Sequence, residues 1–212
     1  VRDAFGIKPI FYKIDNNSIY FASELPALLK LIPEEPNLDL QKSYDYLVHN
    51  DYDSGSGTFI DGVQQLSPAN YLVFDLKSFI ASEPQAWWTP DLKTRTKLSF
   101  EESANKLREL FLESIKLHLR SDVPIGITLS GGIDSSAIAS SVRYLYPNMP
   151  INTFSFIAED QNISEEHWID NLNKKINATS HKIRINNNDI RSDLTEMIKK
   201  QGEPFGSTSI YA

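Results

Sequence analysis

Two runs of β-branched and aromatic residues open the chain and predict a β-hairpin. They cover residues 9–14 (PIFYKI) and 18–23 (SIYFAS), and the Asp-Asn-Asn between them is typical of a tight turn. Residues 24–32 then place leucines and an isoleucine at helical spacing, so we expect a helix with Ser23 as its N-cap and Pro33 at its end. A second short helix is expected to follow.

Residues 71–76 (YLVFDL) and 86–88 (AWW) predict two further strands, separated by an irregular turn. Residues 91–98 (DLKTRTKL) show no apolar period, and they are predicted to link two domains. The first domain is then residues 1–90, and the second is residues 99–212.

The second predicted domain begins with a long amphipathic helix. Ser99 is its expected N-cap, and Glu102 is spaced to complete a capping box. One face of this helix carries apolar residues for a sheet to receive, namely Phe100, Ala104, Leu107, Phe111 and Ile115. Strands and helices then alternate, with strands at residues 125–130, 151–158 and 180–185 and helices at residues 135–146, 165–177 and 189–201. This alternation predicts an α/β fold with a doubly wound parallel sheet.

Composition bounds the class of protein. The 212 residues are 41% apolar and 23% charged, which is enough apolar material for a globular core. The net charge of -7 argues against a general nucleic-acid or membrane-surface binder, because such proteins need clustered Lys and Arg. The sequence has no Cys, so disulfides, thiolate metal sites and a cysteine nucleophile within this chain are excluded.

The hydropathy and the two ends of the sequence indicate where the protein is located and whether it is part of a longer one. No apolar run approaches the roughly 20 residues that cross a bilayer, and no export signal opens the chain, so we expect a cytoplasmic protein. The sequence has no initiator Met, and it begins and ends abruptly within expected elements. We therefore expect an internal piece of a longer protein.

A cluster of small polar residues stands where the strand at residues 125–130 gives way to a helix. Residues 129–136 (LSGGIDSS) contain two adjacent glycines that let the backbone approach an anion, followed by helix amides at the positive end of the dipole. Asp134 would repel a phosphate unless a hard cation such as Mg²⁺ lay between them, so the loop predicts a metal-chelated polyphosphate. The competing interpretation is an ordinary turn in which Asp134 caps the helix.

Two common phosphate loops do not fit, because a Walker A loop needs a Lys and the dinucleotide fingerprint needs a third glycine. The pattern SGGxDS instead resembles the pyrophosphate-binding loop of the N-type ATP pyrophosphatases, which have an adenine nucleotide alpha hydrolase-like fold. Other stretches make the whole chain similar to the glutamine-hydrolysing asparagine synthetase family. They are RDAFGIKPIFY, YFASELPALL, FIDGVQQLSPANYLVFD, TFSF, SHKIRI and EPFGSTSIYA.

The resemblance implies a C-terminal ATP pyrophosphatase domain preceded by the β-rich closing part of an Ntn-type (class II) glutaminase domain. It implies an ATP-dependent amide ligase that converts aspartate to asparagine through β-aspartyl-AMP, with ammonia from glutamine and with ATP and Mg²⁺ bound. The family's N-terminal cysteine nucleophile has no counterpart here, and its second acidic motif should follow Ala212. These residues alone are therefore expected to be inactive.

The same resemblance assigns binding roles in the loop and assigns no catalytic residue to this chain. Asp134 would bind Mg²⁺, the backbone of Leu129 would meet the nucleotide, and the backbone of Phe156 would meet adenine. The remaining loop positions would bind pyrophosphate, namely Ser130, Gly131, Gly132, Ser135 and Ser136. For Phe156 the competing interpretation is a core position, because a strand aromatic is usually packed.

Several other residues have roles that the sequence leaves open. Glu165 and Glu166 open a helix near the same sheet edge, where either could face the nucleotide or simply favour the helix dipole. Glu203 stands where the family carries an acidic pair, but Gly202 replaces the first acid. His181 is expected to be a hydrogen-bonded structural residue.

Two aromatic groups and one ionic pair are expected to be structural. Trp168 and the pair at residues 87–88 are expected in the core or an interface. Arg2 and Asp3 are expected to brace the first sheet through a bidentate ion pair.

Two other functions remain open. One is a related adenylating amidotransferase or a β-lactam synthetase-like ligase that acts on another carboxylate, and the other is a nucleotide-binding module without turnover. The expected partners are small-molecule substrates and the missing N-terminal glutaminase portion of the same polypeptide. Nucleic acid and membranes are not expected partners, and a homodimer is the candidate assembly.

Overall fold

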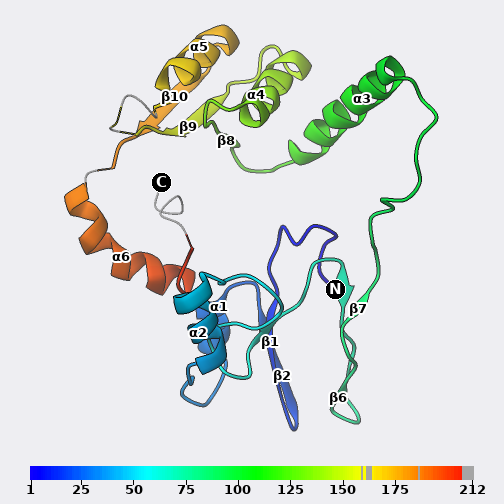
Figure 1. The fold of residues 1–212 in the computed structure, drawn as a ribbon, viewed down its shortest axis with the longest axis vertical. Coiled ribbons are helices and arrows are strands. Elements are labelled where there is room, and N and C mark those ends of the chain that lie inside the picture. Colours follow the sequence, from blue (N-terminus) through cyan, green and yellow to red (C-terminus); the bar gives the residue numbers. More distant parts are fainter. Residues whose placement is uncertain (159, 161–163, 186, 207–212) are drawn as a thin grey trace. The chain divides into compact units, whose positions relative to one another are not determined.

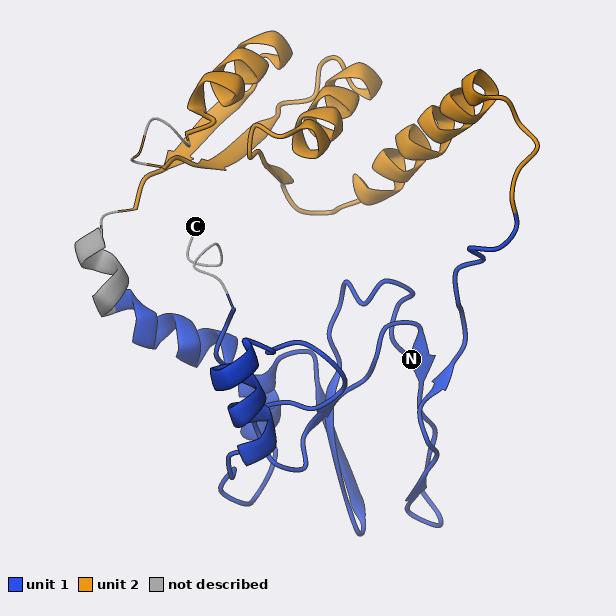
Figure 2. Cartoon of the chain, in the orientation of Figure 1, with its two compact units in different colours: residues 1–94, 190–211 blue, residues 95–189, 212 orange. Residues whose placement is uncertain are grey.

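The computed structural model describes residues 1–158, 160, 164–185 and 187–206. These residues form two compact units (Figure 2). The first unit comprises residues 1–94 with the described residues from 190 onward, and the second comprises residues 95–189.

The first unit is built on the predicted hairpin. Strands β1 (Phe11–Asp15) and β2 (Ser18–Ala22) pair antiparallel, with Asp15 opposite Ser18 across the turn. The short strand β3 (Gln64–Gln65) pairs with the other edge of β1, which gives the order β2-β1-β3. The hairpin prediction is therefore confirmed.

Helices α1 (Leu25–Leu29) and α2 (Leu40–His49) follow the hairpin (Figure 1). Helix α1 is shorter than the predicted range of 24–32, and its N-cap is Glu24 rather than Ser23. Its apolar face is confirmed, since Leu25 and Leu28 are almost fully buried. The core of the unit is one cluster formed by Phe11, Leu25, Leu28, Ile32 and Val63.

A broken hairpin closes this part of the chain. Strands β4 (Asn70–Tyr71) and β7 (Gln85–Ala86) pair with each other, and β5 (Phe74–Asp75) pairs with β6 (Ile80–Ala81). The single strand predicted at residues 71–76 is thus two short strands. The pairing is interrupted where the backbone amide of Val73 donates to the side chain of Ser82 instead of to a backbone carbonyl.

Arg2 and Asp3 brace the first unit separately, and the expected ion pair between them is wrong. The buried guanidinium of Arg2 donates to the carbonyl oxygens of Lys8, Leu66 and Gly6 at 3.0, 2.6 and 2.9 Å. The carboxylate of Asp3 accepts the backbone amides of Phe5, Ile7 and Lys8, which lower its pKa. Both side chains are occupied by backbone groups of the turns around them.

The second unit begins with helix α3 (Phe100–His118), and its capping box is confirmed. The amide of Glu102 donates to Ser99 Oγ at 3.3 Å, and the amide of Ser99 donates to the Glu102 carboxylate at 2.8 Å. The predicted apolar face is buried only toward its end, at Ile115, while Phe100 and Leu107 are 91% and 69% exposed. Among the described helices, none combines the length and apolar character needed to cross a bilayer.

Three parallel strands form the sheet of the second unit in the order β10-β9-β8. Strand β8 (Gly126–Thr128) leads to helix α4 (Ile133–Leu145), β9 (Asn152–Phe156) leads to α5 (Glu166–Ile176), and β10 is Thr179–Ile183. Helix α6 (Asn187–Gln201) follows and runs across the boundary between the units.

Helix α4 contacts both α3 and α5, so these helices form one layer (Figure 1). The core beneath this layer joins Ile115, Ala139, Val142, Ile151 and Ile176. The predicted alternation of strands and helices is confirmed. The doubly wound arrangement stays a prediction, because the described strands follow one another in a single direction across the sheet.

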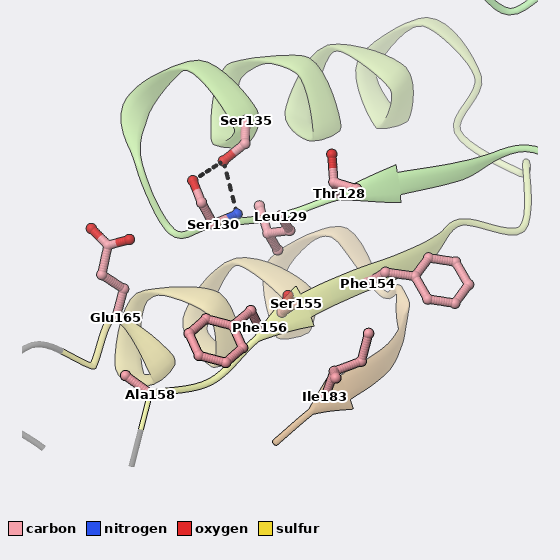
Figure 3. Close-up of a pocket in the computed structure, with 10 residues that line it drawn as sticks. All are labelled: Thr128, Leu129, Ser130, Ser135, Phe154, Ser155, Phe156, Ala158, Glu165 and Ile183. Atoms are coloured by element: carbon pink, nitrogen blue, oxygen red, sulfur yellow. Dashed lines mark hydrogen bonds between the residues drawn. The ribbon is translucent and has the colours of Figure 1, made fainter. Parts of the chain in front are cut away.

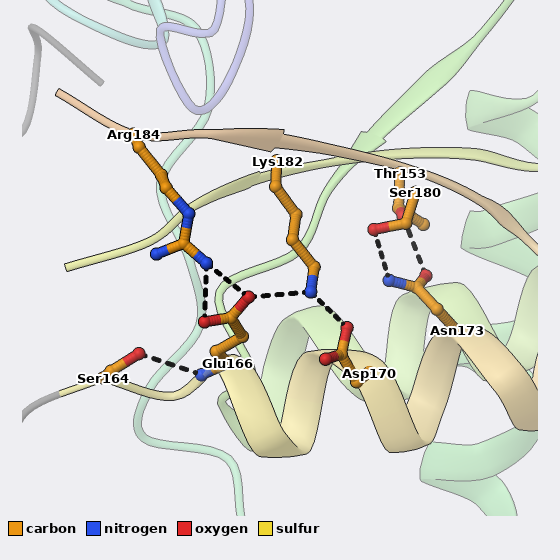
Figure 4. Close-up of polar contacts among 8 residues, drawn as sticks. All are labelled: Thr153, Ser164, Glu166, Asp170, Asn173, Ser180, Lys182 and Arg184. Atoms are coloured by element: carbon orange, nitrogen blue, oxygen red, sulfur yellow. Dashed lines mark hydrogen bonds and ion pairs between the residues drawn. The ribbon is translucent and has the colours of Figure 1, made fainter. Parts of the chain in front are cut away.

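The central strand β9 is polar on its buried side. Thr153 and Ser155 are buried, whereas Phe154 and Phe156 are 40% and 46% exposed. Thr153 Oγ1 donates to Asn173 Oδ1 on α5 at 2.7 Å, and Asn173 Nδ2 donates to Ser180 Oγ on β10 at 3.0 Å (Figure 4). One amide side chain therefore joins α5 to two strands.

We expect Asn173→Ala to lower the free energy of unfolding of the second unit by about 1–3 kcal/mol, because it leaves the buried Thr153 hydroxyl without its acceptor. Asn171→Ala on the exposed side of the same helix is the matched control and is expected to have little effect. Urea denaturation followed by circular dichroism measures both. Equal losses in the two variants would contradict the role given to Asn173.

Candidate functional site

A cavity of about 490 Å³ lies at the carboxyl ends of the parallel strands (Figure 3). Its walls come from the loop after β8, from the start of α4, from the end of β9 and from the start of α5. The lining residues are Thr128, Leu129, Ser130, Ser135, Phe154, Ser155, Phe156, Ala158, Glu165 and Ile183. This edge is where ligands bind in open α/β sheets.

The loop at residues 129–136, named the glycine loop, is anchored at its first residue. The amide of Leu129 donates to the carbonyl oxygen of Phe154 at 2.8 Å, which extends the pairing of β8 with β9 by one residue. The side chain of Leu129 is 1% exposed and packs with Ile157 and Ile169. The loop therefore leaves the sheet from a fixed point.

Two serine hydroxyls hold the shape of the glycine loop. Ser130 Oγ and Ser135 Oγ lie 3.1 Å apart, and Ser135 Oγ accepts the Ser130 amide at 3.2 Å (Figure 3). The amide of Gly132 donates to Ser130 Oγ at 3.3 Å. Both serines nevertheless border the cavity, so their hydroxyls remain next to the space a ligand would fill.

Gly131 is a position that only glycine suits. Its φ is +91°, and a Cβ atom there would lie 2.9 Å from Glu165 Cβ and 3.3 Å from the Glu165 carbonyl oxygen. The loop backbone thus lies directly against the first residues of α5. Gly132 differs, because its φ of -70° is open to any residue and its Cβ would meet only the flexible Ser130 side chain.

Helix α4 begins with its first amides uncapped. Its N-cap is Gly132, and among the described residues no side chain makes a capping bond there. The first amides of a helix lack intrahelical acceptors and stand at the positive end of its dipole, so they favour an anion. The interpretation in which Asp134 caps the helix is wrong, since Asp134 lies within the first turn.

The structure brings several predicted binding residues to the same cavity. Leu129 and Ser130 line it from the loop after β8, Ser135 lines it from α4, and Phe156 lines it from β9. Gly131 and Gly132 lie between the lining serines, while Asp134 and Ser136 lie on the first turn of α4 and outside the lining. Phe156 is 46% exposed, which rules out a plain core position. The binding roles themselves stay predictions.

Sequence reasoning missed Ser155. It is 2% exposed, and its hydroxyl is the one buried side-chain polar atom, among the described residues, that has no hydrogen-bond partner. An unpaired buried hydroxyl is costly unless a ligand or water completes it. The period-two alternation of TFSF places Ser155 on the same side as Thr153, which was the available signal.

The two glutamates at the start of α5 differ in their surroundings. Glu165 lines the cavity, whereas Glu166 is held by ion pairs with Lys182 at 2.8 Å and Arg184 at 2.6 Å (Figure 4). Hydrogen bonds from Lys182 and then Arg184 lower the pKa of Glu166. Of these two residues, only Glu165 is left next to the cavity.

The remaining candidates lie outside the cavity lining. His181 Nε2 lies 3.1 Å from Asn152 Oδ1, and its ring stacks on Phe154 with centroids 4.7 Å apart, which fits the expected structural role. Trp168 is 63% exposed, so it is not a core residue. Glu203 belongs to the first unit, where burial raises its pKa and the Phe59 amide donates to it.

The donor set around the glycine loop suits Mg²⁺ only together with a phosphate ligand. Among the described residues, no group of three His, Asp or Glu side chains could hold a metal. Mg²⁺ is commonly bound by one or two carboxylates plus phosphate oxygens and water, however. Asp134, next to amides that favour an anion, fits that type of site.

Two family models match the chain. A model described as asparagine synthase matches residues 106–212, and a model described as glutamine amidotransferase domain matches residues 1–88. The second match covers the hairpin and the broken hairpin, and the first covers the cavity.

Individual relatives agree with these matches. Asparagine synthetase [glutamine-hydrolyzing] 3 of Bacillus subtilis (strain 168) is 28% identical over 93% of this chain and 34% of its own length. Asparagine synthetase [glutamine-hydrolyzing] 1 of the same organism is 32% identical over 77% of this chain and 25% of its own length. Amidase chry2 of Gibberella zeae is 32% identical over 68% of this chain and 21% of its own length. The chain therefore spans between 21% and 34% of the length of these relatives.

We expect Gly131→Ala to destabilise the second unit by about 1–3 kcal/mol, because it forces a side chain into the left-handed region and against Glu165. Gly132→Ala is the matched control, with an expected cost under about 1 kcal/mol, because its backbone angles suit alanine. Urea denaturation measures both. The interpretation of the loop is wrong if the control costs as much as Gly131→Ala.

The lowered pKa of Glu166 predicts a pH dependence. Its ion pairs stabilise the fold fully above the ordinary glutamate value of about 4.3, and this contribution is lost as pH falls through the lower folded value. The difference in unfolding free energy between wild type and Glu166→Gln should therefore be constant near neutral pH and shrink below about pH 4.3. Urea denaturation across this range measures it, and a difference independent of pH would contradict the assignment.

Proposed function

We propose that this chain, which belongs to the asparagine synthase family, carries the ATP site of an amide ligase. In the proposed reaction, ATP is cleaved between its α and β phosphates and the side-chain carboxylate of aspartate becomes β-aspartyl-AMP. Ammonia then attacks the acyl carbon to give asparagine and AMP, and pyrophosphate is released in the first step. The observation that carries the proposal is the cavity bordered by the glycine loop, with the uncapped start of α4 beside it.

The cavity offers suitable surroundings for both the triphosphate and the base of a nucleotide. The triphosphate would lie on the loop amides and on the hydroxyls of Ser130 and Ser135, because oriented N–H and O–H groups replace the water around its charge. The base would lie against the apolar wall of Phe156 and Ile183, with the unpaired hydroxyl of Ser155 close by. A binding site of this type is mostly apolar with a few placed polar groups.

Asp134 is the proposed Mg²⁺ ligand, since its position in the first turn of α4 puts a carboxylate beside the anion-binding amides. Bound Mg²⁺ would neutralise phosphate charge and so make pyrophosphate a better leaving group. Gly131, Gly132 and Ser136 would shape the backbone around the phosphates. Leu129 would contribute its backbone, since its side chain is committed to the core.

The rest of the proposal concerns the whole protein. We propose that residues 1–90 belong to a glutaminase domain, residues 91–98 to a linker and residues 99–212 to a doubly wound ATP pyrophosphatase domain. Because the sequence has no Cys, the thiol that would release ammonia from glutamine has to come from outside these residues. The proposed location is the cytoplasm, and the proposed assembly is a homodimer.

A second candidate function uses the same adenylation chemistry on a different carboxylate. The observation that favours it is the 32% identity to Amidase chry2 of Gibberella zeae, which is as high as that to an asparagine synthetase. The two candidates differ in product. AMP and pyrophosphate formed with asparagine support the first, and AMP and pyrophosphate formed without asparagine support the second.

We expect Asp134→Asn in the complete protein to lower pyrophosphate release by roughly hundredfold or more, because it removes the charge that holds Mg²⁺. Glutamine hydrolysis should be nearly unchanged, since that reaction needs no phosphate site. Asp122→Asn, an exposed carboxylate before β8, is the matched control and should leave both rates unchanged. A coupled pyrophosphate assay and a glutamate assay measure the two reactions, and equal loss of both in Asp134→Asn would contradict the role of Asp134.

A further inference from the structure

We propose that Glu166 is a positioning residue for the glycine loop, because it ties the start of α5, against which the loop packs, to the end of β10. The inference rests on the proposed function, since it assigns the loop to phosphate binding. It concerns a carboxylate that does not border the cavity and that has no role in the proposed chemistry.

The glycine loop contacts the start of α5. Gly131 approaches Glu165 so closely that a Cβ atom would lie 2.9 Å from Glu165 Cβ, and 3.5 Å from Ile169 Cγ1 one turn later. The loop backbone therefore lies on the first turn of α5. A shift of that turn has to move the loop or open a gap beneath it.

The start of α5 has little support from its own caps. Its N-cap is Glu165, whose own side chain makes no capping bond. The amide of Glu166 donates to Ser164 Oγ at 3.3 Å, which is a long hydrogen bond. The position of the first turn thus depends on contacts made by its side chains.

The carboxylate of Glu166 contacts two basic residues near the end of β10. Its Oε1 accepts from Lys182 Nζ at 2.8 Å and from Arg184 Nη2 at 2.6 Å, and its Oε2 accepts from Arg184 Nη2 at 2.8 Å (Figure 4). Both basic residues lie at the carboxyl end of β10, on either side of Ile183, which lines the cavity. One carboxylate therefore joins the first residue of α5 to the edge strand at the level of the cavity.

The competing explanation is a surface ion pair of little consequence. Side-chain exposures of 30% for Glu166, 28% for Lys182 and 55% for Arg184 predict a small contribution to overall stability. Asp170 provides an internal comparison, because it pairs with the same Lys182 at 2.6 Å but lies one turn after Glu166, away from Glu165, where the approach of Gly131 is closest. If the network only stabilised α5, loss of either carboxylate would have the same effect.

The test compares Glu166→Gln with Asp170→Asn in the complete protein. We expect Glu166→Gln to raise the KM for ATP in pyrophosphate release by roughly three- to tenfold with a smaller change in kcat, because the phosphates meet a displaced loop before reaction. Asp170→Asn should change KM by less than about twofold. Equal changes in KM for the two variants, or a change in melting temperature alone, would overturn the proposal.

A second measurement does not depend on ATP. Hydrogen exchange of the amides at residues 130–135 in the ligand-free protein should become faster in Glu166→Gln and stay unchanged in Asp170→Asn. If wild type releases no pyrophosphate from ATP, the proposed function fails, and the exchange rates alone then decide whether Glu166 positions the loop. Unchanged exchange in Glu166→Gln would overturn the positioning role whatever the enzymatic activity.

Discussion

The parallel pairing of β9 with both of its neighbours is the constraint on which the site depends. Because β8, β9 and β10 run in one direction, their last residues reach the same edge of the sheet, and the segments that follow them meet there. The bond from the Leu129 amide to the Phe154 carbonyl oxygen fixes where the glycine loop departs. Every wall of the cavity follows from this alignment.

The residues around the cavity include locally unfavourable features, and packing elsewhere in the second unit offsets them. An uncapped helix start and an unpaired buried hydroxyl at Ser155 are both unfavourable in the free protein, and the proposed anionic or polar ligand would satisfy both. The compensation comes from apolar contacts between the helix layer and the sheet, and from the burial of Leu129 beneath the loop. Local rules of stability are commonly broken where a protein binds its ligand.

Local sequence patterns were enough to predict the elements and the loop. The capping box at Ser99, the turn of the hairpin and the alternation after residue 125 depend on residues close together in the chain, and each is confirmed. Strand lengths and the burial of Phe100 depend on what packs against them, so the patterns overestimated both. The contact of Gly131 with Glu165 and the pairing of Glu166 with β10 join distant segments, and no periodicity encodes them.

The polar interior side of β9 has a consequence for how the sheet assembles. A slip of one residue along β9 would turn Phe154 and Phe156 toward the helices and Thr153 and Ser155 away from them, which hydrophobicity alone would not oppose. The amide of Asn173, however, finds both of its partners only when Thr153 and Ser180 stand side by side. A hydrogen-bonded triad of this kind would therefore favour the native strand register during folding, because apolar contacts alone would stabilise shifted registers as well.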